Sequence, residues 1–264
     1  MHRRELRAIV TGASGGIGQP LVDKLCAGGA RLLLAARQPL ALASLARSHP
    51  PGQVTVVEAD LLTAAGRDAV LAAAQALGGL NCLINAAGVN RFGLLEDQDD
   101  AAIADLIGLN LTATVQLTAR LLPLLQQADK ALIVNVGSTF GSIGYPGFAA
   151  YCASKFALRG FSEALRRELA DTRVKVLYVA PRATRTAMNS TPVMEMNAAL
   201  SVAMDEPDAV AAAIVRAIRT ERRESYLGWP EKLFVRLNGL LPRAVDHVLR
   251  KQLPVVKRFV RGQS

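Results

Sequence analysis

Two residues four positions apart, Tyr151 and Lys155, pair a weak acid with a cation in this 264-residue chain. Residues at this spacing share one face of a helix, so the Lys155 ammonium can lie beside the Tyr151 phenol. A phenol normally titrates near about 10, too high for easy proton exchange at neutral pH. A fixed positive charge favours the phenolate and moves its pKa toward the working range. Because Tyr-x-x-x-Lys also arises by chance, the rest of the sequence decides whether this pair does chemistry.

A glycine-rich loop, Thr-Gly-Ala-Ser-Gly-Gly-Ile-Gly over residues 11–18, lies between a predicted strand and a predicted helix. Its glycines allow a tight turn and let a pyrophosphate approach the helix N-terminus, where free N–H groups favour anions. A plain strand-to-helix turn is the alternative, but the context is that of a dinucleotide-binding loop. The residues predicted to contact the cofactor here are Gly12, Ser14, Gly15, Gly16, Ile17 and Gly18.

The end of the second predicted strand, Ala35-Ala36-Arg37, bears on which nicotinamide cofactor is bound. An acid at this place would hydrogen-bond a free ribose, whereas an arginine can pair with a 2′-phosphate. Arg37 could also be a solvated loop residue. Since no carboxylate is available here, the sequence favours NADP(H) over NAD(H).

The elements that must position these residues follow a regular alternation. We predict strands at residues 6–10, 32–36, 54–58, 80–84, 131–136, 174–179 and 225–227. Helical patterns occupy residues 18–27, 38–47, 63–77, 98–127, 150–171 and 206–220. Near-continuous apolar strands alternating with helices predict an α/β fold, a doubly wound parallel sheet of about seven strands with helices on both faces, in a single domain.

Ser138 follows the predicted strand at residues 131–136. Ligands of open parallel sheets bind beyond the carboxyl ends of the strands. A hydroxyl at that place can hydrogen-bond a carbonyl oxygen as negative charge builds on it. A loop hydroxyl facing solvent is the alternative, and the Tyr151–Lys155 pair makes it the weaker one.

Five segments together resemble the short-chain dehydrogenase/reductase (SDR) family in its compact form. They are Thr11-Gly12-x-x-x-Gly16-x-Gly18, Asn85-Ala86-Ala87-Gly88, Asn110, Ser138 and Tyr151-x-x-x-Lys155. The match covers residues 6–227 and leaves a basic C-terminal extension. The resemblance implies an enzyme that interconverts a carbonyl and an alcohol by hydride transfer.

The resemblance also implies residue roles. Ser138 would polarise the substrate carbonyl, and Tyr151 would be the proton donor or acceptor. Lys155 would hold the nicotinamide ribose and lower the pKa of Tyr151, while Asn110 would keep a water in a proton relay. At the cofactor, the resemblance implies Asp60 and Leu61 beside the adenine and Thr186 beside the carboxamide. It also implies Asn85, Ala86 and Gly88, in a turn that could instead only support the pocket. The remaining implied cofactor residues are Pro181, Arg182, Thr184, Tyr151 and Lys155.

One residue departs from the family pattern. Pro181-Arg182 stands where the family usually has Pro-Gly. Arg182 puts a charge near the nicotinamide, where it could contact a cofactor phosphate, contact an anionic substrate or point to solvent. It is also the one argument for a different class of function, a catalytically idle NADP(H)-binding module acting through its basic tail.

The substrate side is expected under a lid at about residues 183–207. An apolar or acyl-bearing carbonyl compound is the substrate class that the aromatic and methionine residues favour, although the methionines also fit ordinary packing of a short helix. The predicted substrate residues are Phe140, Tyr145, Phe148, Met188 and Met194. No cluster of acidic, histidine and cysteine residues predicts a metal site.

The chain divides into a catalytic domain at residues 1–228 and a basic, amphipathic, helical extension at residues 229–264. The net charge is +9, of which residues 221–264 carry ten Lys/Arg against four Asp/Glu. The extension could pack on its own domain or on a partner subunit, or it could lie on an anionic membrane; nucleic acid is not expected.

Reduced cysteines without disulfide spacing and apolar runs too short to span a bilayer predict a cytoplasmic protein, at most peripheral to the membrane. The expected partners are a small-molecule substrate and further copies of the chain in a homodimer or homotetramer.

Overall fold

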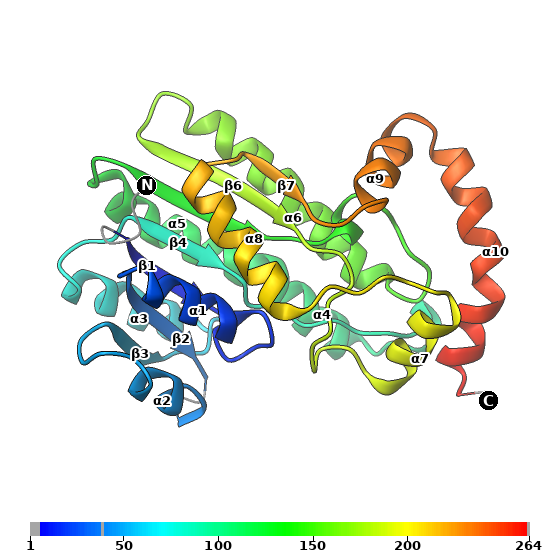
Figure 1. The fold of residues 1–264 in the computed structure, drawn as a ribbon, viewed down its shortest axis with the longest axis horizontal. Helices are drawn as coiled ribbons and strands as arrows, with labels where there is room; N and C mark the ends of the chain where they lie inside the picture. The colour runs from blue at the N-terminus through cyan, green and yellow to red at the C-terminus, as the bar shows by residue number, and fades with distance from the viewer. Residues whose placement is uncertain (1–5, 38–39, 263–264) are drawn as a thin grey trace.

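One parallel sheet organises the molecule. The computed structural model describes residues 6–37 and 40–262. The seven strands lie in the order β3-β2-β1-β4-β5-β6-β7 and pair in parallel, with helices on both faces (Figure 1). The strands are β1 Arg7–Thr11, β2 Arg31–Ala36, β3 Val54–Glu58, β4 Cys82–Asn85, β5 Ala131–Val136, β6 Val174–Ala180 and β7 Glu224–Tyr226. The predicted fold class is confirmed. The ends of the predicted strands agree with those of the observed strands to within two residues.

The helices of the sheet domain also follow the predicted alternation. They are α1 Gly18–Ala27, α2 Leu40–Arg47, α3 Ala64–Ala76, α4 Asp100–Ile107, α5 Ala113–Gln126, α6 Ala149–Glu168 and α8 Pro207–Thr220. The start of the helix predicted at residue 38 lies outside the described residues. Its described part begins at Leu40.

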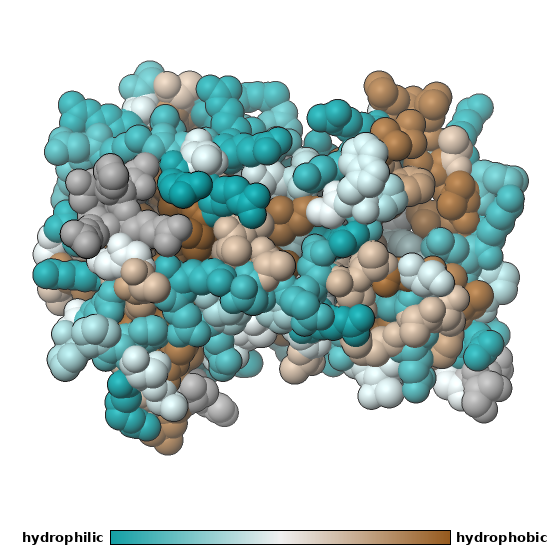
Figure 2. Space-filling model, in the orientation of Figure 1, coloured by the Kyte–Doolittle hydropathy of each residue, from teal (hydrophilic) through white to brown (hydrophobic). Residues whose placement is uncertain are grey.

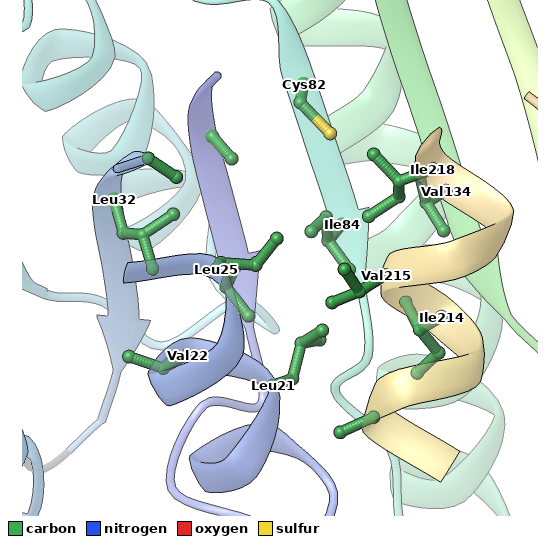
Figure 3. Packing of buried hydrophobic residues seen from close by; sticks show 14 of the residues in the cluster. Leu21, Val22, Leu25, Leu32, Cys82, Ile84, Val134, Ile214, Val215 and Ile218 are labelled. Atoms are coloured by element: carbon green, nitrogen blue, oxygen red, sulfur yellow. The ribbon is translucent and has the colours of Figure 1, made fainter. Parts of the chain in front are cut away.

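Apolar side chains on alternate strand positions form a core on each face of the sheet. Leu21 and Leu25 of α1 and Ile214 and Ile218 of α8 pack against Ile84 of β4 on one face (Figure 3). The opposite face packs against α3, α5 and the last turn of α6. Because successive strand residues point to opposite faces, burial of both faces requires the near-continuous apolar strands seen in the sequence. The three cysteines are free thiols and are buried.

A change of helical pitch interrupts the long helix predicted at residues 98–127. A π-helical turn, Gly108–Thr112, separates α4 from α5. By length and hydropathy alone, Asp100–Gln126 is apolar enough to cross a membrane, although a third of its most apolar window is buried. Leu117, Leu121 and Leu125 pack into the core beneath the sheet, so core packing accounts for one face of this apolar helix.

The C-terminal extension forms two helices, α9 Glu231–Leu240 and α10 Pro242–Val260. α10 continues through Pro254 and packs against α7, Thr191–Ala199, within the predicted lid. Val256 of α10 is fully buried in a cluster with Phe148, Val193 and Met196. The extension therefore closes over the end of the domain where the strands terminate (Figure 1). This part of α10 therefore packs on its own domain, which was one of the alternatives raised by the sequence.

Candidate active site

A cavity of about 970 Å³ lies beyond the carboxyl ends of the strands. Its walls come from the glycine loop, the loops after β2 to β6, α6, the lid and the C-terminal extension. Every candidate residue named from the sequence lines it except Asn85, Asn110 and Met194. The structure thus brings together candidate residues that lie up to 176 positions apart in the chain, from Gly12 to Met188.

The glycine loop is closed by close backbone contacts. Gly12 has a φ of +71°, and a Cβ there would lie 2.7 Å from the backbone of Ala86. A Cβ on Gly16 would lie 2.6 Å from the Thr186 side chain, which faces the loop from the lid. Side chains at these positions would obstruct the approach of β4 and of the lid. The loop leads into the N-terminus of α1, where free N–H groups fit a pyrophosphate.

The far end of the cavity has the donor set expected for an adenosine moiety. Arg37 is exposed where β2 ends, and no ion pair engages it among the residues that the structure describes. Asp60 follows β3, and its carboxylate accepts a hydrogen bond of 3.0 Å from the Leu62 amide. Arg37 and Asp60 both line the cavity. A dinucleotide could therefore lie with its adenosine beside these two residues and its nicotinamide beside Lys155.

Three polar side chains meet in the middle of the cavity. Ser138 follows β5 and caps the short helix Thr139–Gly141, with its Oγ accepting a 3.1 Å hydrogen bond from the Phe140 amide. The Ser138 hydroxyl lies near enough to the Tyr151 phenol to lower the pKa of the phenol. The Lys155 Nζ lies 5.7 Å from the centre of the Tyr151 ring and donates to the Val136 carbonyl at 3.2 Å. One turn of α6 therefore holds an acid and a cation beside a hydroxyl at the end of β5.

Burial dominates the protonation of this group. It raises the pKa of Tyr151 to about 12, against a smaller lowering by the Ser138 hydrogen bond. It lowers the pKa of Lys155 to about 8. The expected lowering of the Tyr151 pKa by Lys155 is therefore absent in the protein alone. The physical reason is that excluding water disfavours both charged forms, and the ammonium is turned toward the Val136 carbonyl.

Asn110 and Asn85 hold the walls of the cavity from behind. The π turn aims Asn110 at the Gly88–Val89 segment, where its amide exchanges bonds of 2.8 and 2.9 Å with the Val89 backbone. Its Nδ2 also donates to the Ser154 Oγ at 3.0 Å. Both amide hydrogens are thus used within the protein, and the side chain supports the wall instead of lining the cavity.

Asn85 likewise does not line the cavity. Its Nδ2 donates to Asn135 and Thr118 at 2.9 and 3.2 Å, joining β4 to β5 and α5. The expected cofactor contact is wrong for this side chain, and the alternative of pocket support agrees with its contacts. Its position in the last residue of a central strand turns the side chain into the core.

Arg182 contacts two carboxylates of the protein, partners that were not among the three alternatives raised by the sequence. Its guanidinium donates to Asp205 at 2.7 Å and to Glu231 at 3.2 Å. Asp205 ends the lid and Glu231 begins α9, so the arginine joins the lid to the C-terminal extension. Gly228, at a φ of +86°, lets the chain pass so close that a Cβ there would lie 2.5 Å from the Arg182 side chain.

The substrate side of the cavity is apolar and aromatic. The rings of Phe140 and Tyr145 stack at 5.0 Å between centroids, and Phe148 lies at 5.4 Å from Phe140. From α7, the residues that line the cavity are Val193, Met196 and Asn197, which lie three and four positions apart on one face. Met194 lies off that face, which corrects its assignment to the substrate site.

The C-terminal extension contributes lining residues that sequence reasoning did not name. They are Glu231, Phe234, Val245, Val248, Leu249 and Gln252. Gln252 accepts a 2.8 Å hydrogen bond from the Tyr145 hydroxyl. The amphipathic pattern of α10 signals a buried face, but no pattern in the sequence says that this face covers the cavity.

The fold and this site together define an α/β oxidoreductase built to hold a nicotinamide dinucleotide. The model of the family described as short chain dehydrogenase matches residues 7–197, and the chain belongs to this family. The family resemblance drawn from the motifs is thereby confirmed. Among the described residues, no group of acidic, histidine and cysteine side chains could hold a metal ion.

Two curated relatives illustrate the range of similarity. Nodulation protein G of Rhizobium sp. (strain N33) is 36% identical over 186 residues, which cover 69% of this chain and 74% of the relative. The ketoacyl reductase HetN of Nostoc sp. is 28% identical over 252 residues, which cover 92% and 87%.

Solved structures agree with the fold. A short-chain dehydrogenase from Burkholderia cenocepacia in complex with NADP has a TM-score of 0.81 at 26% identity, covering 94% of this chain and 99% of that one. A Burkholderia phymatum SDR in complex with NAD has the same TM-score at 24% identity, covering 90% and 95%, and speaks for the fold alone. A nicotinamide cofactor is thus supported, while the choice between the two is left to the residues of this chain.

Proposed function

We propose that this protein is an NADP(H)-dependent oxidoreductase that interconverts a carbonyl and an alcohol on an apolar or acyl-bearing substrate. The observation that carries the proposal is the cluster of Ser138, Tyr151 and Lys155 inside a cavity that also contains the glycine loop and Arg37. When bound, the cofactor supplies or accepts the hydride. The chain's own residues supply orientation, charge stabilisation and the proton.

The three polar residues divide the work at the substrate oxygen. The Ser138 hydroxyl donates to the carbonyl oxygen as negative charge develops there. The Tyr151 phenol, protonated at neutral pH because its pKa is raised, gives its proton to the same oxygen during reduction. The Lys155 ammonium, still charged below a pKa of about 8, would hold the ribose hydroxyls and offset the phenolate that the transfer leaves behind.

Reduction is the direction that this protonation state favours. A phenol that keeps its proton is ready to act as an acid, whereas alcohol oxidation needs a phenolate as base. The free phenol therefore supports NADPH-driven reduction near neutral pH, with oxidation gaining as the pH rises. The role of Asn110 in a water relay stays a prediction, since its side chain bonds the Val89 backbone behind the cavity wall.

Arg37 and the aromatic wall support the finer assignments. An arginine at the end of β2, without an ion-pair partner among the described residues, suits a 2′-phosphate better than a free ribose hydroxyl. The rings of Phe140, Tyr145 and Phe148 suit an apolar or acyl chain. The name of the Nostoc relative, a ketoacyl reductase, agrees with an acyl-bearing carbonyl compound. The departure at Arg182 no longer argues for the idle-module alternative, because its ion pairs with Asp205 and Glu231 give the arginine a structural role.

The test measures NADPH oxidation over a panel of ketones, quinones and acyl thioesters. Tyr151→Phe is expected to lower kcat by about 100- to 10,000-fold, the range for a general acid, while NADPH binding followed by fluorescence stays within about threefold. Tyr226→Phe is the matched control, since its hydroxyl bonds Ser142 away from the cavity lining. Turnover of no substrate by the wild type, or full activity of Tyr151→Phe, would overturn the proposal.

A further inference from the structure

Exposed hydrophobic side chains gather where α9 turns into α10. Leu240 and Leu241 form the turn itself and are 79% and 57% exposed. Trp229, just before α9, and Leu233, in its first turn, are also exposed. We call these four residues the apolar tip. Figure 2 shows hydrophobic residues concentrated over α9 and the start of α10, whereas most of that face of the molecule is hydrophilic. A contiguous exposed patch of this kind marks an interaction surface.

The charges around the apolar tip are mostly of one sign. Exposed cations flank it on both helices, and the exposed acidic residue of the same segment is Asp246. The cations are Lys232, Arg236, Arg243, Arg250 and Lys251. Glu231 does not offset them, because it is paired with Arg182. Apolar side chains ringed by lysine and arginine are the pattern of a segment that lies in the surface of an anionic bilayer.

The cavity reaches the same surface. Phe234 of α9 and Val248 of α10 both line the cavity and are exposed to solvent. Phe234 follows Leu233 of the apolar tip in the chain, so the tip adjoins a residue that lines the same cavity as Ser138. Phe234 and Val248 lie on the two helices of the extension, at the end of the molecule opposite α2 (Figure 1).

We propose that the apolar tip inserts into an anionic membrane surface and that an apolar carbonyl substrate enters the cavity from the bilayer. The basic residues hold the helices against the headgroups, while the leucines and Trp229 reach the acyl boundary. Substrate then passes between Phe234 and Val248 without crossing water. The substrate part rests on the proposed function, whereas membrane binding stands on the surface itself.

The binding test uses the full chain and vesicles of phosphatidylcholine, with or without a minority of phosphatidylglycerol, in a flotation assay. The wild type is expected to float with the anionic vesicles and to be released as salt is raised, because headgroup attraction is screened. The affinity of the double variant Leu240→Asp/Leu241→Asp for these vesicles should fall at least about tenfold, since the substitutions put charges into the inserted surface. Leu40→Asp is the matched control, an exposed leucine on α2 at the opposite end of the molecule.

A second arm separates entry from chemistry. Neither Leu240 nor Leu241 lines the cavity, so the double variant should reduce a short, water-soluble ketone at the wild-type rate. On a long-chain ketone dissolved in the anionic vesicles, its rate should fall about tenfold, following the loss of binding.

Three results would overturn the inference and leave the proposed function standing. The first is turnover of soluble ketones with no vesicle binding by the wild type. The second is vesicle binding that the double variant and Leu40→Asp share equally. The third is a dimer that the double variant abolishes, which would mean that a second copy of the chain covers the apolar tip. Loss of all turnover alongside intact vesicle binding would instead refute the proposed function.

Discussion

At the residue scale, one cause acts on Tyr151 and Lys155 in opposite directions. Exclusion of water raises the pKa of the phenol and lowers that of the ammonium, so that both drift toward their neutral forms. The phenol keeps its proton for the substrate oxygen. Burial destabilises the folded protein at Lys155, because keeping the buried ammonium charged costs free energy.

The pH dependence of stability should reveal that cost. Below pH 8 Lys155 is charged in both the folded and the unfolded chain, so its burial cost is fully present. Between about 8 and its ordinary value of 10.5, the folded protein releases the proton first and the cost is removed. Relative to Lys155→Met, the wild type should therefore gain up to about 3 kcal/mol in free energy of unfolding. Urea unfolding of both proteins at pH 7 and pH 10 measures the change.

The exposed Lys232→Met serves as the control for this comparison, because no burial acts on that side chain. Its difference from the wild type should be the same at both pH values. A Lys155→Met difference that also stays constant with pH would contradict the account of a buried ammonium.

Arg37 should decide the cofactor preference. Arg37→Asp places a carboxylate where we propose the 2′-phosphate to bind, so the ratio of kcat/KM for NADPH over NADH is expected to fall about tenfold or more. Arg47→Asp changes the same residue type on the neighbouring helix α2, outside the cavity, and should leave the ratio unchanged. An unchanged ratio in Arg37→Asp would mean that the arginine is only a solvated loop residue.

At the element scale, the lid and the extension act as one unit because Arg182 ties them together. The guanidinium spans from Asp205 at the end of the lid to Glu231 at the start of α9, and all three side chains are largely buried. α7 and α10 meet nearby through Met196 and Val256. The lid and the extension therefore form one connected wall of the cavity.

Removing this tie should destabilise the protein. Arg182→Met leaves two largely buried carboxylates without their partner, at an expected cost of about 1–3 kcal/mol in free energy of unfolding. Arg185→Met removes a nearby lid ion pair with Glu206 that is mostly exposed, and should cost less than about 1 kcal/mol. Urea unfolding compares the two. Equal losses would show that the Arg182 network holds no more than a surface pair does.

At the scale of the whole molecule, the apolar helix Asp100–Gln126 leaves much of its surface uncovered, with a third of its most apolar window buried. We expect a second copy of the chain to cover it, in a homodimer or homotetramer. Light scattering should then give about two or four times the chain mass of 28.0 kDa. A concentration-independent mass of one chain would contradict this expectation.

The sequence by itself determined the sheet, the order of its elements and the group at its centre. Apolar strands buried on both faces have a pattern that few other folds share, and Tyr151 and Lys155 are brought together by a single helix turn. The glycine loop was readable from its local spacing between a strand and a helix, whereas the close approach of the Ala86 backbone to Gly12 and of the Thr186 side chain to Gly16 appears only in the folded chain.

Only the tertiary structure decided what surrounds that centre. Asn85 and Asn110 turn into the walls because of hydrogen bonds to strands and helices far along the chain. Arg182 finds Asp205 and Glu231, and Gln252 finds Tyr145, through packing of the extension that no local pattern encodes. Local geometry fixes what a turn of helix brings together, whereas contacts between distant segments depend on the packing of the whole chain.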